Sequence, residues 1–228
     1  MAQQRRDLER TREKILAAAA SEFAAKGLAG ARVDAIARRA RVNKQMLYYC
    51  FGSKRELYRI VLSSKLTART HFLDALPNNI EEALLHIFDH STADIDFVRM
   101  LQWEALEPTG DARLVAQDER RALFLKGIEK FSQAQRQGFI PADVDPRHLL
   151  ISFIACSVFP LAFRQMIHLL TGLEPTDPKF RRQRRQFLGW LGRRLADKPH
   201  AAINSHRVNG TSRASRSKAA NTTLSKSP

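Results

Sequence analysis

The stretch of residues 32–56, RVDAIARRARVNKQMLYYCFGSKRE, constrains the fold of this chain more than any other part of the sequence. Apolar side chains recur at helical spacing in two short runs, Val33–Ala40 and Lys44–Phe51, with a tight turn between them. Asn43 can cap the second run, and Ser53 opens a Ser-x-x-Glu capping box. The stretch therefore predicts two short helices joined by a turn and followed by the capped start of another helix.

An amphipathic helix is predicted before this stretch. Its apolar stripe repeats every four residues and consists of Ile15, Ala19 and Phe23. We expect this helix to begin near the N-cap Thr11 and to end near Gly27, a residue suited to a helix stop. The polar residues 1–10 are expected to be a flexible N-terminal arm, so that the three helices occupy residues 11–56.

With these helices in place, the chain resembles the tetracycline-repressor (TetR) family of bacterial transcriptional regulators. The family pattern IAxxAGVsxxxLYxxFxSKxxL is matched by Ile36, Ala37, Ala40, Val42, Leu47, Tyr48, Phe51, Ser53, Lys54 and Leu57. The chain departs from the pattern at Arg41, where the family usually has Gly, and at Arg32, where it usually has Ser or Thr. A left-handed backbone at Arg41 should cost roughly 1 kcal/mol.

The resemblance implies an all-α fold in two parts. The first is an N-terminal three-helix helix-turn-helix DNA-binding domain at residues 11–56, and the second is a C-terminal helical ligand-binding and dimerisation domain at residues 57–198. Residues 199–228 are rich in Ser, Asn, Thr and Ala and contain no acidic residue, so we expect a disordered basic tail.

The net charge of +15 is concentrated at the two ends of the chain. Residues 1–56 carry 13 Lys and Arg against 6 Asp and Glu, a net charge of +7, whereas residues 57–198 carry 20 against 17, a net of +3. The tail adds 5 basic residues and no acidic one. This distribution favours a polyanion as the partner of the N-terminal domain.

The candidate DNA contacts lie around the third helix. They are Arg32, Asn43, Lys44, Gln45, Met46, Tyr48, Tyr49 and Lys54. At the start of a helix in the major groove, Gln45 can pair with adenine, Lys44 with guanine or a phosphate, and Met46 with a thymine methyl group. The two tyrosine hydroxyls can bind phosphates, and the resemblance makes Lys54 a phosphate contact. The alternative is that Lys44 and Gln45 are merely solvated and the tyrosines merely packed.

Residues 57–198 show helical patterns without the alternation of strands. A long amphipathic helix should be capped by Asp111 and end near Gly138. The run 149–170 is apolar on nearly all sides, which predicts a helix buried at a subunit interface. Together with a last helix at about 177–195, this run resembles the pair of helices that forms the dimeric four-helix bundle of the family.

A small molecule would bind within this second domain. The candidate ligand contacts are His86, Phe97, Met100, Trp103, Phe124, Phe153 and Cys156. Aromatic and sulfur side chains with a few polar groups are typical of ligand pockets. The alternative for each of them is an ordinary place in the hydrophobic core.

Several other classes of protein fit the sequence poorly. Cys50 and Cys156 have no partner at metal-site or redox spacing, and no apolar run is long enough for a signal or a membrane span, so we expect a cytoplasmic protein that does not enter a membrane. His86 and His90 lie four residues apart without a third metal ligand. No phosphate-binding glycine loop or nucleophile elbow is present. We therefore expect no catalytic residue, no metal site and no cofactor, and hence no enzyme.

The sequence thus predicts a homodimeric transcriptional regulator that binds a pseudo-palindromic operator in double-stranded DNA, because one short helix reads too few base pairs alone. Its most favoured form is a repressor that a small-molecule effector releases from the operator. The alternative is an effector-independent DNA-binding dimer that a protein partner regulates.

Overall fold

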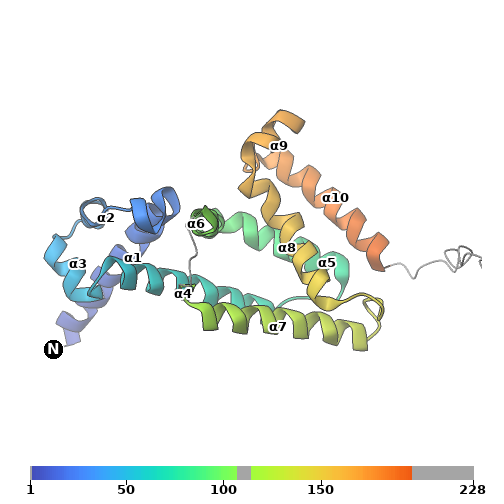
Figure 1. Cartoon of the computed structure of the whole chain (residues 1–228), viewed down its shortest axis with the longest axis horizontal. Coiled ribbons are helices and arrows are strands. Elements are labelled where there is room, and N and C mark those ends of the chain that lie inside the picture. The colour runs from blue at the N-terminus through green and yellow to red at the C-terminus, as the bar shows by residue number, and fades with distance from the viewer. Residues whose placement is uncertain (1, 107–113, 197–228) are drawn as a thin grey trace, which may run out of the picture. The chain divides into compact units, whose positions relative to one another are not determined.

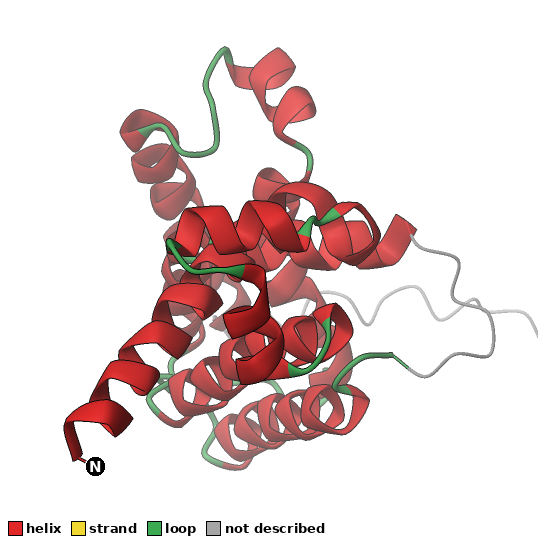
Figure 2. Cartoon of the chain, turned by 90° about the vertical axis from the view of Figure 1, so that its left-hand side faces the viewer, coloured by secondary structure: helices red, strands yellow, loops and turns green. Residues whose placement is uncertain are grey.

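Helices connected by turns make up residues 2–106 and 114–196, which are the residues that the computed structural model describes (Figure 1). The helices are α1 (Ala2–Gly30), α2 (Val33–Ala40), α3 (Lys44–Phe51), α4 (Lys54–Asp74), α5 (Ile80–Ala93), α6 (Ile95–Leu106), α7 (Gln117–Arg136), α8 (Pro146–Ala162), α9 (Arg164–Thr171) and α10 (Pro178–Ala196). Among these residues there is no strand (Figure 2). The predicted all-α fold is confirmed. The predicted disordered tail lies outside the described residues.

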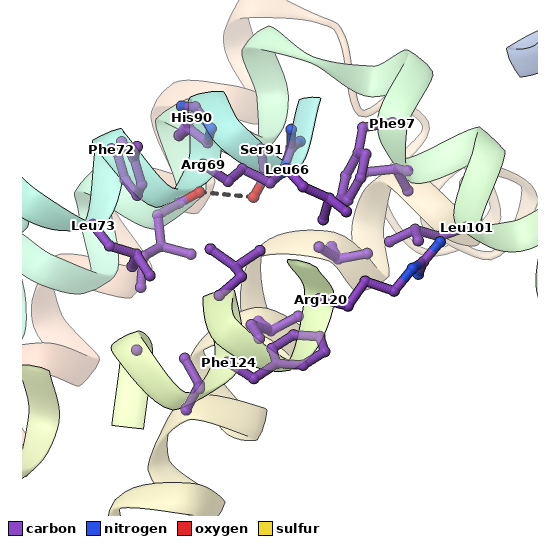
Figure 3. Close-up of a pocket in the computed structure, with 17 residues that line it drawn as sticks. Leu66, Arg69, Phe72, Leu73, His90, Ser91, Phe97, Leu101, Arg120 and Phe124 are labelled. Atoms are coloured by element: carbon purple, nitrogen blue, oxygen red, sulfur yellow. Dashed lines mark hydrogen bonds between the residues drawn. The ribbon is translucent and has the colours of Figure 1, made fainter. Parts of the chain in front are cut away.

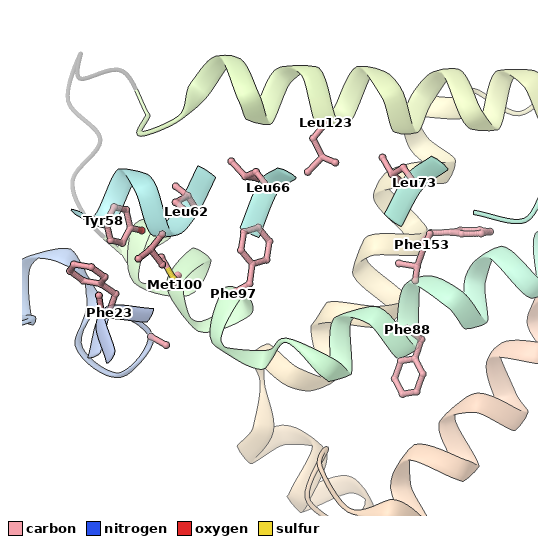
Figure 4. Packing of buried hydrophobic residues seen from close by; sticks show 14 of the residues in the cluster. Phe23, Tyr58, Leu62, Leu66, Leu73, Phe88, Phe97, Met100, Leu123 and Phe153 are labelled. Carbon is pink, nitrogen blue, oxygen red and sulfur yellow. The ribbon is translucent and has the colours of Figure 1, made fainter. Parts of the chain in front are cut away.

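The first three helices, which we call the head, pack around the apolar stripe of α1. Ile15 and Phe23 from α1, Ile36 from α2 and Leu47 from α3 are fully buried. Phe23 also packs edge-on against Tyr58 of α4, with ring centroids 5.0 Å apart (Figure 4). The predicted inward faces of the short helices are therefore confirmed, and α4 shares the core of the head.

The start of α1 was predicted wrongly. The helix begins at Ala2, and the hydroxyl of Thr11 donates a hydrogen bond to the backbone oxygen of Asp7 one turn earlier, at 2.8 Å, instead of capping an N-terminus. Pairs of side chains four residues apart, such as Arg5 and Glu9, support this first part of the helix. At Gly27 the backbone leaves the helical conformation, with φ 67° and ψ 178°, so α1 has a kink where a stop was predicted.

The turn between α2 and α3 has the conformation that the sequence predicts. Arg41 adopts the left-handed backbone, with φ 57° and ψ 44°, and the next amide, of Val42, donates to the backbone oxygen of Ala37 at 3.0 Å. Arg32 precedes α2 in an extended conformation and makes no capping hydrogen bond with its side chain. Asn43 then caps α3, because its side-chain oxygen accepts the amide of Met46 at 2.7 Å.

Replacing Arg41 by glycine should stabilise the protein. A left-handed backbone costs a non-glycine residue roughly 1 kcal/mol that glycine does not lose. We expect the free energy of unfolding of Arg41→Gly, measured with urea, to rise by up to about this amount, and operator binding to weaken slightly because one exposed positive charge is lost. Arg39→Gly is the matched control, since this exposed residue is helical, and it should destabilise by about 1 kcal/mol. A less stable Arg41→Gly protein would contradict the role assigned to this turn.

The capping box at the start of α4 forms only in part. The Ser53 hydroxyl accepts the amide of Glu56 at 3.0 Å, as predicted. The Glu56 carboxylate does not return to the Ser53 amide, which donates to Phe51 instead, and it binds the guanidinium of Arg59 at 2.6 Å. A bidentate, charge-assisted pair with arginine is stronger than the single hydrogen bond to an amide, which explains the difference.

The remaining helices, which we call the body, pack around α4, α5 and α8. Helix α7 runs beside α4, α5 lies against both α8 and α10, and α6 contacts α8 and the α1 helix of the head (Figures 1 and 2). Figure 4 shows Leu66, Leu73 and Phe97 in the core between these helices, close to Leu123 of α7. Head and body therefore share one compact unit, residues 1–197.

Two helix boundaries of the body differ from the prediction. Helix α7 begins at Gln117, and the predicted cap Asp111 lies outside the described residues. The apolar run 149–170 is not one helix, because α8 ends before Phe163 and α9 continues at an angle of 82°. No single helix of the described part of the chain is long and apolar enough to cross a membrane, and only the bent pair of α8 and α9 together passes by length and composition.

Pro160 weakens α8 shortly before this bend. Proline has no backbone N–H, so it leaves the oxygen of Cys156, one turn earlier, without its helical hydrogen bond. A guanidinium nitrogen of Arg184 in α10 donates to that oxygen at 2.8 Å. The gap in the hydrogen bonding of one helix is thus filled by a side chain of another.

Helices α5 and α10 approach each other closely at Gly192. A Cβ atom at Gly192 would lie 2.5 Å from the Cα atom of Glu81 in α5, whereas a Cβ atom at Gly189 would meet only the end of the Glu81 side chain, at 3.0 Å. Ion pairs of Arg193 with Glu81 and of Arg185 with Asp89 flank this contact. The absence of a side chain at Gly192 therefore sets the distance between the two helices.

Candidate DNA-binding surface and ligand cavity

Helix α3 presents its predicted contact residues to solvent. Gln45 is exposed, Tyr48 and Tyr49 are 42% and 78% exposed, and Met46 is half-buried. Leu47 and Phe51, on the other side of the helix, anchor it in the core of the head. The sequence places two aromatic rings outward here against the usual preference for burial, which fits a surface that contacts another molecule.

The two lysines among the predicted DNA contacts also bind within the protein. The ammonium group of Lys44 lies 3.0 Å from the carboxylate of Asp34 in α2, and this hydrogen bond and the negative charge raise the pKa of Lys44. The ammonium group of Lys54 donates to the backbone oxygens of Ala29 and Ala31 at 3.2 Å, at the end of α1. To bind DNA, each lysine would have to add a DNA group to its present partners or replace one of them.

Arg32, directly before α2, has an exposed side chain. Its amide donates to the carboxylate of Glu22 at 3.3 Å, which fixes the backbone between α1 and α2. The guanidinium group itself is therefore available to a phosphate. The contacts of Arg32, Asn43 and the other candidates with DNA stay predictions.

A cavity of about 170 Å³ lies in the body between α4, α5, α6, α7 and α8 (Figure 3). Its walls are mainly apolar and consist of Leu66, Phe72, Leu73, Ile87, Phe97, Val98, Leu101, Leu123, Phe124, Gly127, Leu150, Ile154 and Val158. The polar residues on the wall are Arg69, His90, Ser91 and Arg120. An apolar hollow with few polar groups is the usual form of a small-molecule site.

Phe97 and Phe124 are the predicted ligand contacts that line this cavity. Met100 is fully buried in the core instead. Phe153 and Cys156 line a separate hollow of about 250 Å³ beside α5 and α10. Both therefore belong to another side of α8 than Leu150, Ile154 and Val158, which line the first cavity.

The two other predicted contacts also lie away from the cavity wall. His86 is exposed and its ring stacks on Phe72, with centroids 5.8 Å apart. Trp103 packs on α1, as described below. Sequence reasoning missed Arg69, His90 and Arg120, although the position of Arg69 between Leu66 and Leu73 on the apolar side of α4 was a usable signal.

The charged groups of the cavity wall pair with carboxylates that do not themselves line the cavity. Asp94 accepts hydrogen bonds from Lys65 at 2.6 Å and from Arg69 at 3.0 Å. Burial alone raises the pKa of Asp94, but these hydrogen bonds and positive charges bring it below its ordinary value. Burial lowers the pKa of Arg69 in spite of its bonds to Asp94. Arg120 pairs with Glu104 of α6 at 2.6 Å.

His90 is the polar group of this wall that lacks a partner. Its Nε2 atom is buried and makes no hydrogen bond, and its ring stacks on Phe72 with centroids 4.0 Å apart. Burial, followed by the nearby charge of Arg69, lowers the pKa of His90. The imidazole is therefore held in its neutral form at neutral pH. Within the described ranges, no three His, Cys, Asp or Glu side chains gather as a metal site.

Helix α6 contacts both the cavity and the head. Phe97, Val98 and Leu101 line the cavity. Trp103, further along the same helix, donates from its indole nitrogen to the backbone oxygen of Ala24 in α1 at 3.2 Å, and its ring covers Gly27, where a Cβ atom would lie 3.1 Å away. Helix α6 thus connects the wall of the cavity to the kink of α1.

A capped three-helix head with an exposed third helix, joined to a helical body with an apolar cavity, defines the class of helix-turn-helix DNA-binding regulators. Residues 15–61 match the family described as bacterial regulatory proteins, tetR family, and residues 77–190 match the tetracyclin repressor-like C-terminal domain. The chain belongs to the TetR family, and it is a DNA-binding transcriptional regulator.

Individual relatives agree with this assignment. The HTH-type transcriptional repressor SCO4008 of Streptomyces coelicolor is 34% identical over 167 residues, which cover 73% of this chain and 86% of the relative. The crystal structure of the putative transcriptional regulator SCO4942 from the same organism has a TM-score of 0.69 and 28% identity, and covers 83% of this chain and 99% of the other.

A more distant structure shares the fold. The transcriptional regulator FadR of Bacillus subtilis, in complex with stearoyl-CoA, has a TM-score of 0.60 at 15% identity, covering 77% of this chain and 96% of that one. At this level of identity the likeness concerns the fold alone.

Proposed function

We propose that this regulator is a homodimeric repressor that binds a pseudo-palindromic operator and is released from it by a small molecule in the cavity of the body. The observation that carries the proposal is the double role of α6, which lines the cavity with Phe97, Val98 and Leu101 and contacts the head through Trp103. A ligand that favours one position of α6 therefore favours one position of the head.

In the DNA complex, α3 lies in the major groove with its N-terminal residues toward the base edges. Gln45 is the exposed side chain at that end, and it pairs with adenine through its amide. Tyr48, Tyr49 and Arg32 bind phosphates on either side of the groove. Lys44 binds DNA either in place of Asp34 or together with it, since both members of that ion pair are exposed.

Replacing Gln45 by alanine should weaken binding to the operator more than binding to unrelated DNA. A bidentate pair between an amide and adenine is worth about 1–3 kcal/mol of discrimination, so we expect roughly 5- to 150-fold weaker binding to the operator at a fixed salt concentration. Gln133→Ala is the control, because Gln133 is an exposed residue of α7 outside the head. Equal losses on operator and unrelated DNA would show that Gln45 reads no base.

The dimer forms through α8, α9 and α10. These helices leave large apolar side chains in solvent, namely Ile151, Phe159, Leu169, Leu170, Phe187 and Trp190. Large apolar side chains exposed on neighbouring helices favour association, and a two-fold axis allows the same helices of two protomers to meet each other. Paired heads about 34 Å apart then reach two successive major grooves on one side of the DNA.

Release follows from a shift between two positions of the heads. A ligand lowers DNA affinity only by as much as it prefers the state whose heads do not fit the operator. Arg120 of α7 provides a second connection between the cavity and the head. It lies on the cavity wall, and its partner Glu104 is adjacent to Trp103 in α6.

The test begins with the operator. Genomic fragments bound by the full-length protein identify it, and a compound screen then measures both the melting temperature of the protein and its operator affinity. A releasing ligand should raise the melting temperature and weaken operator binding together. If no compound changes operator affinity while a second protein does, the alternative of an effector-independent dimer with a protein partner replaces this proposal.

A further inference from the structure

The polar side chains on the cavity wall share one feature, which is that none of them is acidic. Arg69 and Arg120 are cationic and His90 and Ser91 are neutral, within the part of the chain that the structure describes. Ser91 already donates its hydroxyl proton to the backbone oxygen of Ile87, at 2.8 Å. The groups that can meet a ligand are therefore the imidazole of His90 and two guanidinium groups that already have partners. That of Arg69 bonds to Asp94 and lies over the Phe97 ring, 3.5 Å from its centroid, and that of Arg120 pairs with Glu104.

The charges around Arg69 do not balance. One carboxylate, Asp94, faces two cations, Lys65 and Arg69, whose side chains are 18% and 12% exposed. Arg120 and Glu104 balance each other. Among the described residues these two clusters leave an excess of one positive charge beside an apolar wall, where electrostatic attraction is stronger than in water.

The buried Nε2 atom of His90 needs a partner on the same side of the cavity. An unpaired buried polar atom costs free energy that a ligand recovers by forming the hydrogen bond. Figure 3 shows Arg69, Phe72 and His90 grouped along one side of the cavity and Arg120 and Phe124 along the other. An acceptor placed between Arg69 and a protonated Nε2 would satisfy both.

The size and walls of the cavity limit the rest of the ligand. A volume of about 170 Å³ is close to the roughly 150 Å³ of an apolar cavity known to hold benzene in another protein. Three rings, those of Phe72, Phe97 and Phe124, line it. Aromatic rings favour offset or edge-on contacts with a further ring, so the space fits one aromatic ring with a short substituent.

We propose that the cavity binds a one-ring aromatic monocarboxylate, with its ring among Phe72, Phe97 and Phe124 and its carboxylate between Arg69 and His90. The inference rests on the proposed function, of which it specifies the ligand. In the tautomer that carries its proton on Nε2, the unpaired Nε2 atom of His90 donates to the carboxylate, and Lys65 keeps Asp94 paired when Arg69 turns toward the ligand.

The test compares three probes of equal size on the full-length protein by calorimetry: 4-ethylbenzoate, 4-ethylbenzamide and 4-ethylbenzylamine. A charge-assisted pair is roughly twice as strong as a neutral hydrogen bond, so we expect 4-ethylbenzoate to bind about tenfold more tightly than the amide. The amine should bind most weakly. Equal or tighter binding of the amide or the amine, or no binding of any probe, would overturn the inference.

Two substitutions locate the carboxylate. Arg69→Gln leaves Asp94 paired with Lys65 and should remove the preference for 4-ethylbenzoate over the amide, while the affinity for the amide stays the same. Arg59→Gln is the control on the same helix, because Arg59 is exposed and pairs with Glu56. His90→Phe keeps a ring for the stack on Phe72 and should weaken 4-ethylbenzoate more than 4-ethylbenzamide, because a bond to a carboxylate is stronger than one to an amide oxygen. An unchanged preference in Arg69→Gln would place the anion elsewhere.

Operator binding separates this inference from the proposed function. The same three probes are added to the protein on its operator. Release by 4-ethylbenzoate alone supports both, whereas release by a neutral or cationic compound from the screen keeps the repressor and rejects the anionic ligand. Should Arg69→Gln fail to fold, the comparison of the three probes on the unaltered protein still decides.

Discussion

Replacing Gly192 by alanine should destabilise the protein by about 2 kcal/mol, within the usual range for side chains forced into a packed contact. The added Cβ atom would lie 2.5 Å from the Cα atom of Glu81, and a backbone atom cannot move aside without displacing the whole of α5. Alanine favours a helix over glycine by about 1 kcal/mol, which offsets only a part of this cost. Urea unfolding at a fixed protein concentration measures the loss.

Gly189→Ala is the matched control on the same helix. There the added Cβ atom would meet the carboxylate oxygen of Glu81 at 3.0 Å, and the end of a long side chain can turn away. We expect this variant to be as stable as the parent or more stable. Equal losses in both variants would mean that flexibility of α10, and not the contact with the backbone of α5, accounts for the effect.

Replacing Trp103 by alanine should separate the head from the cavity. The substitution removes the ring that covers Gly27 and the hydrogen bond to Ala24. Since Trp103 is 39% exposed, we expect a loss of stability of about 2 kcal/mol, below the 3–5 kcal/mol of a fully buried aromatic residue. Operator affinity without ligand should persist because α3 and its core are unchanged.

The larger effect of Trp103→Ala concerns ligand response. Coupling between two sites is typically about 1–3 kcal/mol, so a releasing ligand that weakens operator binding roughly 5- to 150-fold in the parent should have little effect in the variant. Trp103→Phe is the control, because it keeps a ring over Gly27 and should retain most of the response. Normal release from Trp103→Ala would show that the signal takes another path.

The head could be predicted from the sequence because its structure is determined locally. The caps Asn43 and Ser53, the left-handed residue Arg41 and the inward residues of α2 and α3 each follow from their near neighbours in the chain. Two cap predictions failed: Thr11 lies inside α1 and does not cap it, and the Glu56 side chain pairs with a competing neighbour, Arg59, three residues further on.

The body was less predictable because its decisive contacts join residues far apart in the sequence. From the sequence, Phe97, Phe124, Met100 and Phe153 were equally good candidates for ligand contacts. Only the packing of α4, α7 and α8 shows that the first two line the cavity and that the other two are buried in the core. The bend between α8 and α9 was missed because the run was interpreted as one apolar helix, although Pro160 before the break and Arg164 directly after it interrupt the apolar pattern.

The polar groups of the cavity show the same limit. Arg69 and Lys65 lie on α4, but their shared partner Asp94 precedes α6, and no local pattern relates them. His90 was visible as one member of a histidine pair. Only the structure shows that the His90 ring packs against Phe72 and forms part of the cavity wall.

The hydrogen bond between Arg184 and the backbone of Cys156 has a consequence for how this chain can change in evolution. A mutation of Pro160 to a residue with an N–H would let α8 satisfy the Cys156 oxygen itself, and that oxygen, which can accept two hydrogen bonds, would no longer depend on Arg184. Loss of Arg184 alone would leave the backbone oxygen unpaired. Arg184 is therefore needed as a donor only while residue 160 is proline, so a change at position 184 should be tolerated best after Pro160 has been replaced.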